Sequence, residues 1–363
     1  MESSKSARLT VVKLSEDEKS VIILDQTKLP NHEEYITIHD EKRAWDAIKR
    51  LEIRGAPAIG VFAGYAMYVL AQQYTDKRYE DFKAEFLRQA EYLNSSRPTA
   101  VNLSWALKRQ AGVVEKNADK NPAEIAALLG AEAKKIDAEN EEMTRKIAEY
   151  GVTLVKDGDG ILTHCNAGYL ACLGYGTATA PIYYGQEKGM TFHVYSDETR
   201  PLLQGARLTA FELSSAGMDV TLECDNMSAS LMKTGKVQAV FVGCDRVASN
   251  GDAANKIGTS LLALAAKHYG VPFYVCAPTS TIDMSLQTGD EIPIEQRKPE
   301  EVTEMWYEKR MAPEGIKVYN PAFDVTDHTL ITGIVTEYGV ARAPYTTSLR
   351  EIFAKKTQND ASI

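Results

Sequence analysis

The segment "QAVFVGCDRVASNGDAANKIGT" (238–259) joins an apolar run to a polar turn and decides the class of fold. After the glutamine its residues are apolar up to Gly243, and Asp245 follows almost at once. A short apolar run bounded by turn residues is typical of a fully buried strand in a parallel sheet. A carboxylate directly behind such a strand lies at the edge where open α/β sheets bind ligands, so the segment predicts a site as well as a fold.

Four further segments repeat this pattern of an apolar run that ends in polar residues. They alternate with helical patterns such as "KIGTSLLALAAKHYG" (256–270), which Lys256 is expected to open. Short apolar strands separated by helices indicate βαβ units, and therefore a parallel sheet with helices on both faces. The polar strand ends should then share one edge of that sheet. The four segments are "GILTHC" (160–165), "TFHVYSDE" (191–198), "DVTLECD" (219–225) and "PFYVCAP" (272–278).

The chain before this alternation is organised differently. Residues 8–40 contain three short β-like runs, and helical periodicity continues from there to about residue 150. Asp40 precedes the first helical pattern and is a suitable N-cap. The sequence thus predicts an α/β protein with a small N-terminal β plus helical domain (1–150) and a Rossmann-like parallel-sheet C-terminal domain (151–363).

Composition and charge narrow the classes of partner. The 363 residues carry a net charge of -9 and no segment dense in Lys or Arg, which argues against nucleic acid and anionic membranes as partners. We expect a cytoplasmic protein, because the first residues lack the apolar run of a signal peptide and no stretch is long enough to span a membrane. The five cysteines form no CxxC pair, which argues against disulfides and a structural zinc site.

Neither a dinucleotide nor a metal is expected at the sheet edge. The segment "CNAGYLACLGYG" (165–176) has glycines, but not in the G-x-G-x-x-G spacing that binds a pyrophosphate. His164, Cys165, Cys244 and Asp245 are metal-ligating residue types, yet adjacent His and Cys residues seldom bind one ion and the usual ligand spacing is missing. We therefore expect no cofactor and no metal.

Two loops in the N-terminal part have the features of anion sites. "EIRGAPAIG" (52–60) and "SSRPTAVNL" (95–103) each place an Arg before a Pro that suits the first turn of a helix. A helix start presents free backbone N–H groups and the positive end of the helix dipole, and Arg54 or Arg97 would add charge. Each loop is a candidate cradle for a phosphate or a carboxylate, although a solvated arginine next to a packing turn explains either loop equally well.

The motifs together resemble one family over almost the whole chain. The chain is similar to the methylthioribose-1-phosphate isomerases, whose motifs occur in the same order. These isomerases resemble in fold the regulatory subunits of the eukaryotic translation-initiation nucleotide exchange factor. The resemblance implies an aldose-ketose isomerase of methionine salvage that acts on a sugar phosphate without a cofactor, as a homodimer. It rests on "RGAPAIG", "SRPTAVNL", "LTHCNAG", "ETRPLLQGARLTAFEL", "GCDRVASNGDAANKIGT" and "NPAFDVTDHTLITGIVTEYGV".

The resemblance also implies roles for individual residues. By their positions in these motifs, Cys165 and Asp245 match the catalytic pair of the family, which its regulatory relatives lack. Cys244 departs from the small residue, such as Ala, that the family pattern suggests there. The residues that match the substrate-binding positions are Arg54, Gly55, Ala56, Arg97, Gln204, Asn255 and Lys256.

The residue types suggest how such a pair would act. A protonated Asp245, its pKa raised by burial behind the apolar run, would donate to the ring oxygen of the sugar as the ring opens. Cys165 would either remove the proton from C2 in an enediol route or shield the carbons while hydride moves from C2 to C1. A packed, inert thiol is the ordinary role of a cysteine at a strand end, and only the motif argues against it here.

Two alternatives stay open at this stage. One is isomerisation of a related sugar phosphate, either 5-deoxyribose 1-phosphate or ribose 1,5-bisphosphate, because a difference in the 5-substituent is read only by the shape of the pocket. The other is a non-catalytic regulatory subunit of the same fold. The presence of both Cys165 and Asp245 favours the enzyme.

Overall fold

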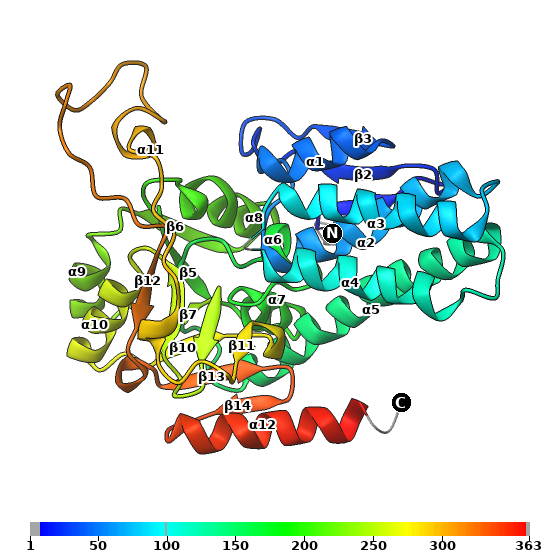
Figure 1. Ribbon diagram of the computed structural model, residues 1–363. Helices are drawn as coiled ribbons and strands as arrows, with labels where there is room; N and C mark the ends of the chain where they lie inside the picture. Colours follow the sequence, from blue (N-terminus) through cyan, green and yellow to red (C-terminus); the bar gives the residue numbers. More distant parts are fainter. Residues whose placement is uncertain (1–7, 99, 361–363) are drawn as a thin grey trace, which may run out of the picture. The chain divides into compact units, whose positions relative to one another are not determined.

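The computed structural model describes residues 8–98 and 100–360 (Figure 1). This chain forms two compact units. The first, here called the helical unit, contains Arg8–Met143 and Tyr169–Gly174, and the second, the sheet unit, contains Thr144–Gly168 and the described chain from Tyr175 onward. Compactness alone does not define an independently folding domain, so the domain division at 150/151 stays a prediction.

The helical unit begins with a small antiparallel sheet of order β1-β2-β3. Asp40 caps the helix that follows, as predicted, because its side chain accepts the backbone N–H of Arg43 at 2.8 Å. The structure thus confirms the predicted short N-terminal β-strands and the helices that follow them. The elements are β1 (Val12–Leu14), β2 (Val21–Leu24), β3 (Tyr35–Ile38), α1 (Glu41–Lys49), α2 (Ala56–Ala71), a 3₁₀ turn (Gln72–Tyr74), α3 (Tyr79–Ser95), α4 (Val101–Lys116) and α5 (Pro122–Val152), whose last part belongs to the sheet unit.

Helix α2 is the centre of the helical unit. It is apolar on every side and all but two of its 16 residues are buried, as expected for a helix that other helices surround. Its glycines allow the close approach of its neighbours, since a Cβ on Gly60 would lie 3.3 Å from the Asn102 carbonyl oxygen of α4. Figure 1 shows α3 and α4 running alongside α2.

The sheet unit is built on a seven-stranded sheet of order β14-β13-β10-β7-β4-β5-β6. All neighbours are parallel except β13 and β14, which form an antiparallel pair at one edge. The central strands β4, β7 and β10 are buried along their whole length, which explains their continuous apolar character. The predicted parallel Rossmann-like sheet is therefore confirmed. Its strands are β4 (Gly160–His164), β5 (His193–Asp197), β6 (Asp219–Glu223), β7 (Ala239–Val242), β10 (Phe273–Cys276), β13 (Gly333–Thr336) and β14 (Gly339–Ala341).

A second, four-stranded sheet of order β11-β8-β9-β12 was not predicted. Its hairpin turns through Asn250-Gly251-Asp252 and brings β9 back beside β8, so that Lys256 ends a strand instead of opening a helix. Asn-Gly between short apolar runs is a strong hairpin signal, but a sharp turn alone also fits this pattern. The strands are β8 (Arg246–Ala248), β9 (Ala253–Lys256), β11 (Ile282–Asp283) and β12 (Phe323–Thr326).

Helices connect the strands of the large sheet, and the last helix, α12, runs beside β14 (Figure 1). No helix within residues 8–98 and 100–360 combines the length and apolar character needed to cross a membrane. The remaining elements are α6 (Tyr169–Cys172), which belongs to the helical unit, α7 (Ala180–Glu187), a π-helical turn (Gly205–Thr209), α8 (Ala210–Ser215), α9 (Ser228–Lys233), α10 (Thr259–Tyr269), α11 (Glu300–Thr303), α12 (Tyr345–Asp360) and 3₁₀ turns at Thr279–Thr281, Gly289–Glu291 and His328–Leu330.

Candidate active site

Cys165 and Asp245 follow two adjacent strands of the large sheet. β4 and β7 are parallel, and His164 at the end of β4 is in register with Val242 at the end of β7. Cys165 is the next residue after β4, and Asp245 stands three residues after β7. The carboxyl edge of a parallel sheet is where such folds bind ligands, and the register places both predicted catalytic residues at that edge.

The backbone of Cys165 is held in an unusual conformation. Its φ is +68°, in the left-handed region that non-glycine residues rarely adopt. The surrounding structure compensates, because the N–H of Cys165 donates to Thr199 Oγ1 at 2.8 Å and its carbonyl accepts from Thr209 Oγ1 at 2.6 Å. Such strain is typical of functional sites, where it sets the direction of one side chain. Cys165 is also buried.

Asp245 differs from the expectation in one respect. Its backbone N–H donates to the Ala254 carbonyl at 2.9 Å and so ties the end of β7 to β9. Its side chain is exposed, however, and the predicted burial is wrong. The apolar run ends at Gly243, and the chain turns out of the sheet before it reaches the carboxylate. The neighbouring thiol of Cys244 lies 3.1 Å from Thr281 Oγ1.

Asn255 and Lys256 are buried at the end of β9. The side-chain amide of Asn255 donates to Thr259 Oγ1 at 3.0 Å in the first turn of α10. The Lys256 ammonium donates to the Ala322 carbonyl at 2.8 Å and lies 4.5 Å from the centre of the Phe323 ring. These two contacts hold the Lys256 ammonium at the end of β9, where it can donate to an anion.

Gln204 is buried directly before the π-helical turn that follows β5. Its Oε1 atom has no hydrogen-bond partner among the described residues. Buried acceptors of this kind are rare in folded proteins, because the lost hydrogen bond to water is not replaced. The atom can accept a hydrogen bond from a ligand hydroxyl.

The other predicted binding residues lie in the helical unit. Gly55 precedes α2 with φ +89°, and a Cβ there would come within 2.2 Å of the Ala171 carbonyl oxygen, so only glycine fits. Arg54 and Ala56 flank it, and Pro57 occupies the first turn of α2 as predicted. The N-terminus of this long helix therefore has the features of an anion site.

The second loop does not have the predicted form. Helix α3 ends at Ser95 and α4 begins only at Val101. Pro98 therefore lies outside both helices, and the prediction that it occupies the first turn of one is wrong. Arg97 lies half-buried in this connection, where its backbone N–H donates to the Asn94 carbonyl at 3.2 Å.

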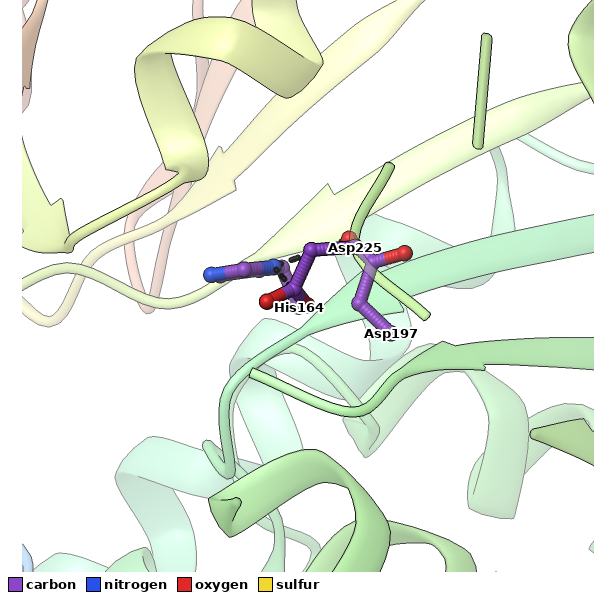
Figure 2. Close-up of side chains that lie close together, drawn as sticks. All are labelled: His164, Asp197 and Asp225. Carbon is purple, nitrogen blue, oxygen red and sulfur yellow. Dashed lines mark hydrogen bonds and ion pairs between the residues drawn. The ribbon is translucent and has the colours of Figure 1, made fainter. Parts of the chain in front are cut away.

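A group of one histidine and two aspartates, absent from the predicted site residues, lies at the same edge (Figure 2). His164 Nδ1 lies 2.8 Å from Asp197 Oδ2 and 3.9 Å from a carboxylate oxygen of Asp225. Burial opposes a charge on the ring, but the hydrogen bond and negative charge of Asp197, with Asp225 behind it, raise the pKa of His164. His164 and Asp197 each stand in the sequence as a polar residue at the end of an apolar run. Nothing in the sequence indicates that the two side chains pair.

The same three residues have the spacing of a metal site. One ligand atom from each of His164, Asp197 and Asp225 lies within 4.8 Å of the others. His164 already uses Nδ1 for Asp197, and its Nε2 lies 2.9 Å from the Ile257 carbonyl. Since both ring nitrogens have acceptors as partners, the geometry is that of an ion pair and not of a metal ligand. A second group with this spacing is formed by Asp252, Asp327 and His328.

The comparisons with known proteins agree with this fold. The model described as "Initiation factor 2 subunit family" matches residues 52–343, and the chain belongs to that family. It is 57% identical over 347 residues to the methylthioribose-1-phosphate isomerase of Symbiobacterium thermophilum, which covers 96% of this chain and 97% of the relative. It is 53% identical over 342 residues to the 5-deoxyribose 1-phosphate isomerase of Petrotoga mobilis, covering 94% of this chain and 98% of the relative.

Solved structures show the same relationship. The 5-methylthioribose 1-phosphate isomerase of Pyrococcus horikoshii OT3 superposes with a TM-score of 0.91 at 42% identity, over 96% of this chain and 97% of that one. The translation initiation factor eIF-2B subunit delta of A. fulgidus superposes with a TM-score of 0.88 at 38% identity, over 95% of this chain and 99% of that one. Proteins titled as isomerases and as initiation factor subunits thus share this fold.

Proposed function

We propose that this chain converts the aldose 5-methylthioribose 1-phosphate to the ketose 5-methylthioribulose 1-phosphate, in methionine salvage. The observation that carries the proposal is the register of β4 and β7, which brings Cys165 and Asp245 to one sheet edge. Relatives named methylthioribose-1-phosphate isomerase cover nearly the full chain at 56–57% identity and support the same substrate.

The phosphate ester on C1 sets the chemical problem. The furanose ring cannot open by loss of an anomeric hydroxyl proton, because the phosphate occupies that oxygen. In our proposal Asp245 donates a proton to the ring oxygen as the bond between that oxygen and C1 breaks.

Cys165 then acts at C1 and C2. In the enediol route its thiolate takes the proton from C2 and a proton is afterwards delivered to C1. In the hydride route the hydrogen of C2 moves with its electron pair to C1, and Cys165 excludes water from the two carbons. Both routes leave a carbonyl at C2 once its hydroxyl proton is lost, and both retain the phosphate ester.

We assign the other predicted residues to substrate binding. Lys256 and Asn255 supply buried donors, and Gln204 supplies a buried acceptor without a partner among the described residues. Arg54, Gly55, Ala56 and Arg97 are assigned to binding through the resemblance of their motifs and through the helix start at Ala56.

Product analysis tests the activity. The purified protein is incubated with 5-methylthioribose 1-phosphate, and the ketose is detected by ¹H and ¹³C NMR. The same assay in deuterated water separates the routes, because solvent deuterium at C1 of the product indicates the enediol and its absence indicates hydride transfer or a fully shielded proton. Binding of the sugar phosphate without turnover would overturn the proposal in favour of a regulatory subunit.

A second candidate substrate is 5-deoxyribose 1-phosphate, since the Petrotoga mobilis relative carries that name. The two sugars differ only in the 5-substituent, and a small apolar group is worth only about 1–3 kcal/mol in a pocket. Comparison of kcat/KM for both sugars and for ribose 1,5-bisphosphate identifies the preferred substrate. A rate with either alternative that exceeds the rate with the methylthio sugar would replace the first assignment.

We also propose that the protein acts in the cytoplasm as a homodimer. The homodimer rests on the resemblance to the isomerase family, and the cytoplasm is the location expected from the sequence. Light scattering of the purified protein tests the homodimer, and a measured mass of one chain would contradict it.

A further inference from the structure

His164 is buried in the sheet unit and makes two hydrogen bonds there, one through each ring nitrogen. Nε2 lies 2.9 Å from the carbonyl oxygen of Ile257. A carbonyl only accepts, so Nε2 carries a proton and donates. Nδ1 lies 2.8 Å from Asp197 Oδ2 on the neighbouring strand β5 (Figure 2). The side chains of His164 and Asp197 are only 1% and 2% exposed, so water does not compete for these bonds.

The surrounding groups favour a proton on Nδ1 as well. Asp225 brings a second carboxylate oxygen to 3.9 Å from Nδ1, and Ser228 Oγ donates to the other oxygen of Asp197 at 2.6 Å. The Asp225 carboxylate is itself held by the backbone N–H groups of Thr199 and Arg200, at 2.7 and 2.8 Å. A ring with a carbonyl on one side and two carboxylates on the other is stable as an imidazolium that donates from both nitrogens.

One end of this arrangement is covalently tied to Cys165. His164 is the preceding residue, and Thr199, which donates to Asp225, also accepts the N–H of Cys165 through its hydroxyl. A shift of the ring or of the Asp225 loop therefore changes the backbone that holds Cys165 in its left-handed conformation.

The other end is the turn that follows Asn255 and Lys256. Ile257 accepts from the ring, and Gly258 packs on it so closely that a Cβ would lie 2.8 Å from His164 Cε1. From its other side the turn is held by Asp324, whose oxygens accept the N–H groups of Gly258 and Ser260 at 2.9 and 3.1 Å. Burial raises the pKa of the Asp324 carboxyl, and the positive charge of His164 acts against that rise.

We propose that His164 is a positioning residue that fixes the proposed base or shield, Cys165, relative to the substrate-binding pair Asn255 and Lys256. It does so through two ring hydrogen bonds, to Asp197 on the side of β5 and to Ile257 on the side of β9. This role rests on the proposed function, because only the proposed function assigns Cys165 and the pair Asn255 and Lys256 to the same substrate. His164 itself touches neither the sugar nor its phosphate in this role.

Two substitutions separate the two bonds. The amide nitrogen of Asn occupies about the place of Nδ1 and that of Gln about the place of Nε2, so His164→Asn keeps the donor toward Asp197 and His164→Gln keeps the donor toward Ile257. Because a displacement of about 1 Å at an active site costs up to about a hundredfold, we expect changes of about tenfold from either variant. His164→Asn should mainly raise KM and the Kd for the sugar phosphate, and His164→Gln should mainly lower kcat.

The matched control is His193→Gln. His193 forms a similar pair with Asp219, but at the opposite end of the sheet and with 34% and 70% of the two side chains exposed. We expect its kcat, KM and Kd to stay within about twofold of the wild type, because exposed pairs contribute little. Thermal unfolding of all three variants shows whether each is folded.

Nitrogen-15 NMR of the wild-type ring provides a readout that needs no variant. We expect both ring nitrogens of His164 to be protonated near neutral pH, in slow exchange with water. A neutral ring with one N–H overturns the arrangement, and so do folded variants that change kcat, KM and Kd by less than about threefold or that change them identically.

Failure of the proposed function has a different signature. In that case the wild type binds 5-methylthioribose 1-phosphate but makes no product, while the ring signals and the Kd of His164→Asn still report on the positioning role.

Discussion

Two His–Asp pairs lie at opposite ends of neighbouring strands in the same sheet. His164 and Asp197 are the last residues of β4 and β5, and His193 and Asp219 are the first residues of β5 and β6. The first pair is 1% and 2% exposed and the second 34% and 70%. The same two residue types therefore form a buried ionic link at the carboxyl edge and a solvated contact at the amino edge.

The difference arises from what covers each edge. At the carboxyl edge the turn Ile257–Gly258 and the Asp225 loop close over the ring. At the amino edge the His193 ring bonds to strand β6 through Asp219 and through Thr221 Oγ1 at 3.0 Å, and it lies beside the Tyr195 ring of its own strand, with 4.5 Å between the ring centres. Charges in a solvated pair are screened, whereas a buried charge without its partner is costly. The pairs should accordingly respond very differently to the same substitution.

The largest expected difference is in activity. Asp245→Asn at the carboxyl edge removes the proposed acid, and we expect kcat to fall at least about a hundredfold. Asp219→Asn at the amino edge should leave kcat within about twofold, because it changes only a solvated contact. Steady-state kinetics on 5-methylthioribose 1-phosphate measure both, and a nearly normal rate for Asp245→Asn would remove Asp245 from the mechanism.

The next difference is in stability. Asp197→Asn leaves the His164 charge buried without its closest carboxylate, and we expect the free energy of unfolding to fall by about 3 kcal/mol. Asp219→Asn should cost less than about 1 kcal/mol. Denaturant unfolding of both variants near neutral pH tests this, and equal losses would show that the two edges do not differ in burial in solution.

Glycines at the two ends of α10 sharpen the comparison further. Gly258 (φ +104°) and Gly270 (φ +71°) both have positive φ, but only at Gly258 would a Cβ meet the His164 ring. Gly270→Ala should cost about 1 kcal/mol for backbone strain alone. Gly258→Ala should cost at least about 2 kcal/mol, because the ring must also move. Equal costs in denaturant unfolding would mean that the turn does not rest on the ring.

A further difference is a pH dependence at the end of β6. Burial and the negative charge of Asp197 raise the pKa of Glu223 from its ordinary 4.5 to about 7. Between these values the folded protein holds a proton that the unfolded chain has released, so Glu223 lowers stability as the pH rises from about 4.5 to about 7. Glu223→Gln removes this loss.

The Tm of Glu223→Gln relative to the wild type should therefore be higher at about pH 8 than at about pH 5. The exposed Glu308 offers the control, since Glu308→Gln removes one carboxylate from the surface. A Tm difference for Glu223→Gln that does not change with pH would show that Glu223 titrates normally.

The sequence predicted the parallel sheet well, because each central strand is an uninterrupted apolar run with polar residues at its end. Predictions that depended on one turn were less successful. Lys256 ends a strand, Pro98 lies outside any helix and the Asp245 side chain is exposed. In each case the local pattern was compatible with two conformations, and packing against distant segments selected one.

The sequence by itself determined which residues lie at the carboxyl edge, since the end of an apolar run marks the end of a buried strand. Only the tertiary structure decided which of these residues meet. The hydrogen bonds of His164 join it to residues 33 and 93 positions away. No local periodicity encodes such contacts, because they depend on the order of the strands and on the turn that covers them. The same physical reason makes His164–Asp197 a buried link and His193–Asp219 a solvated one.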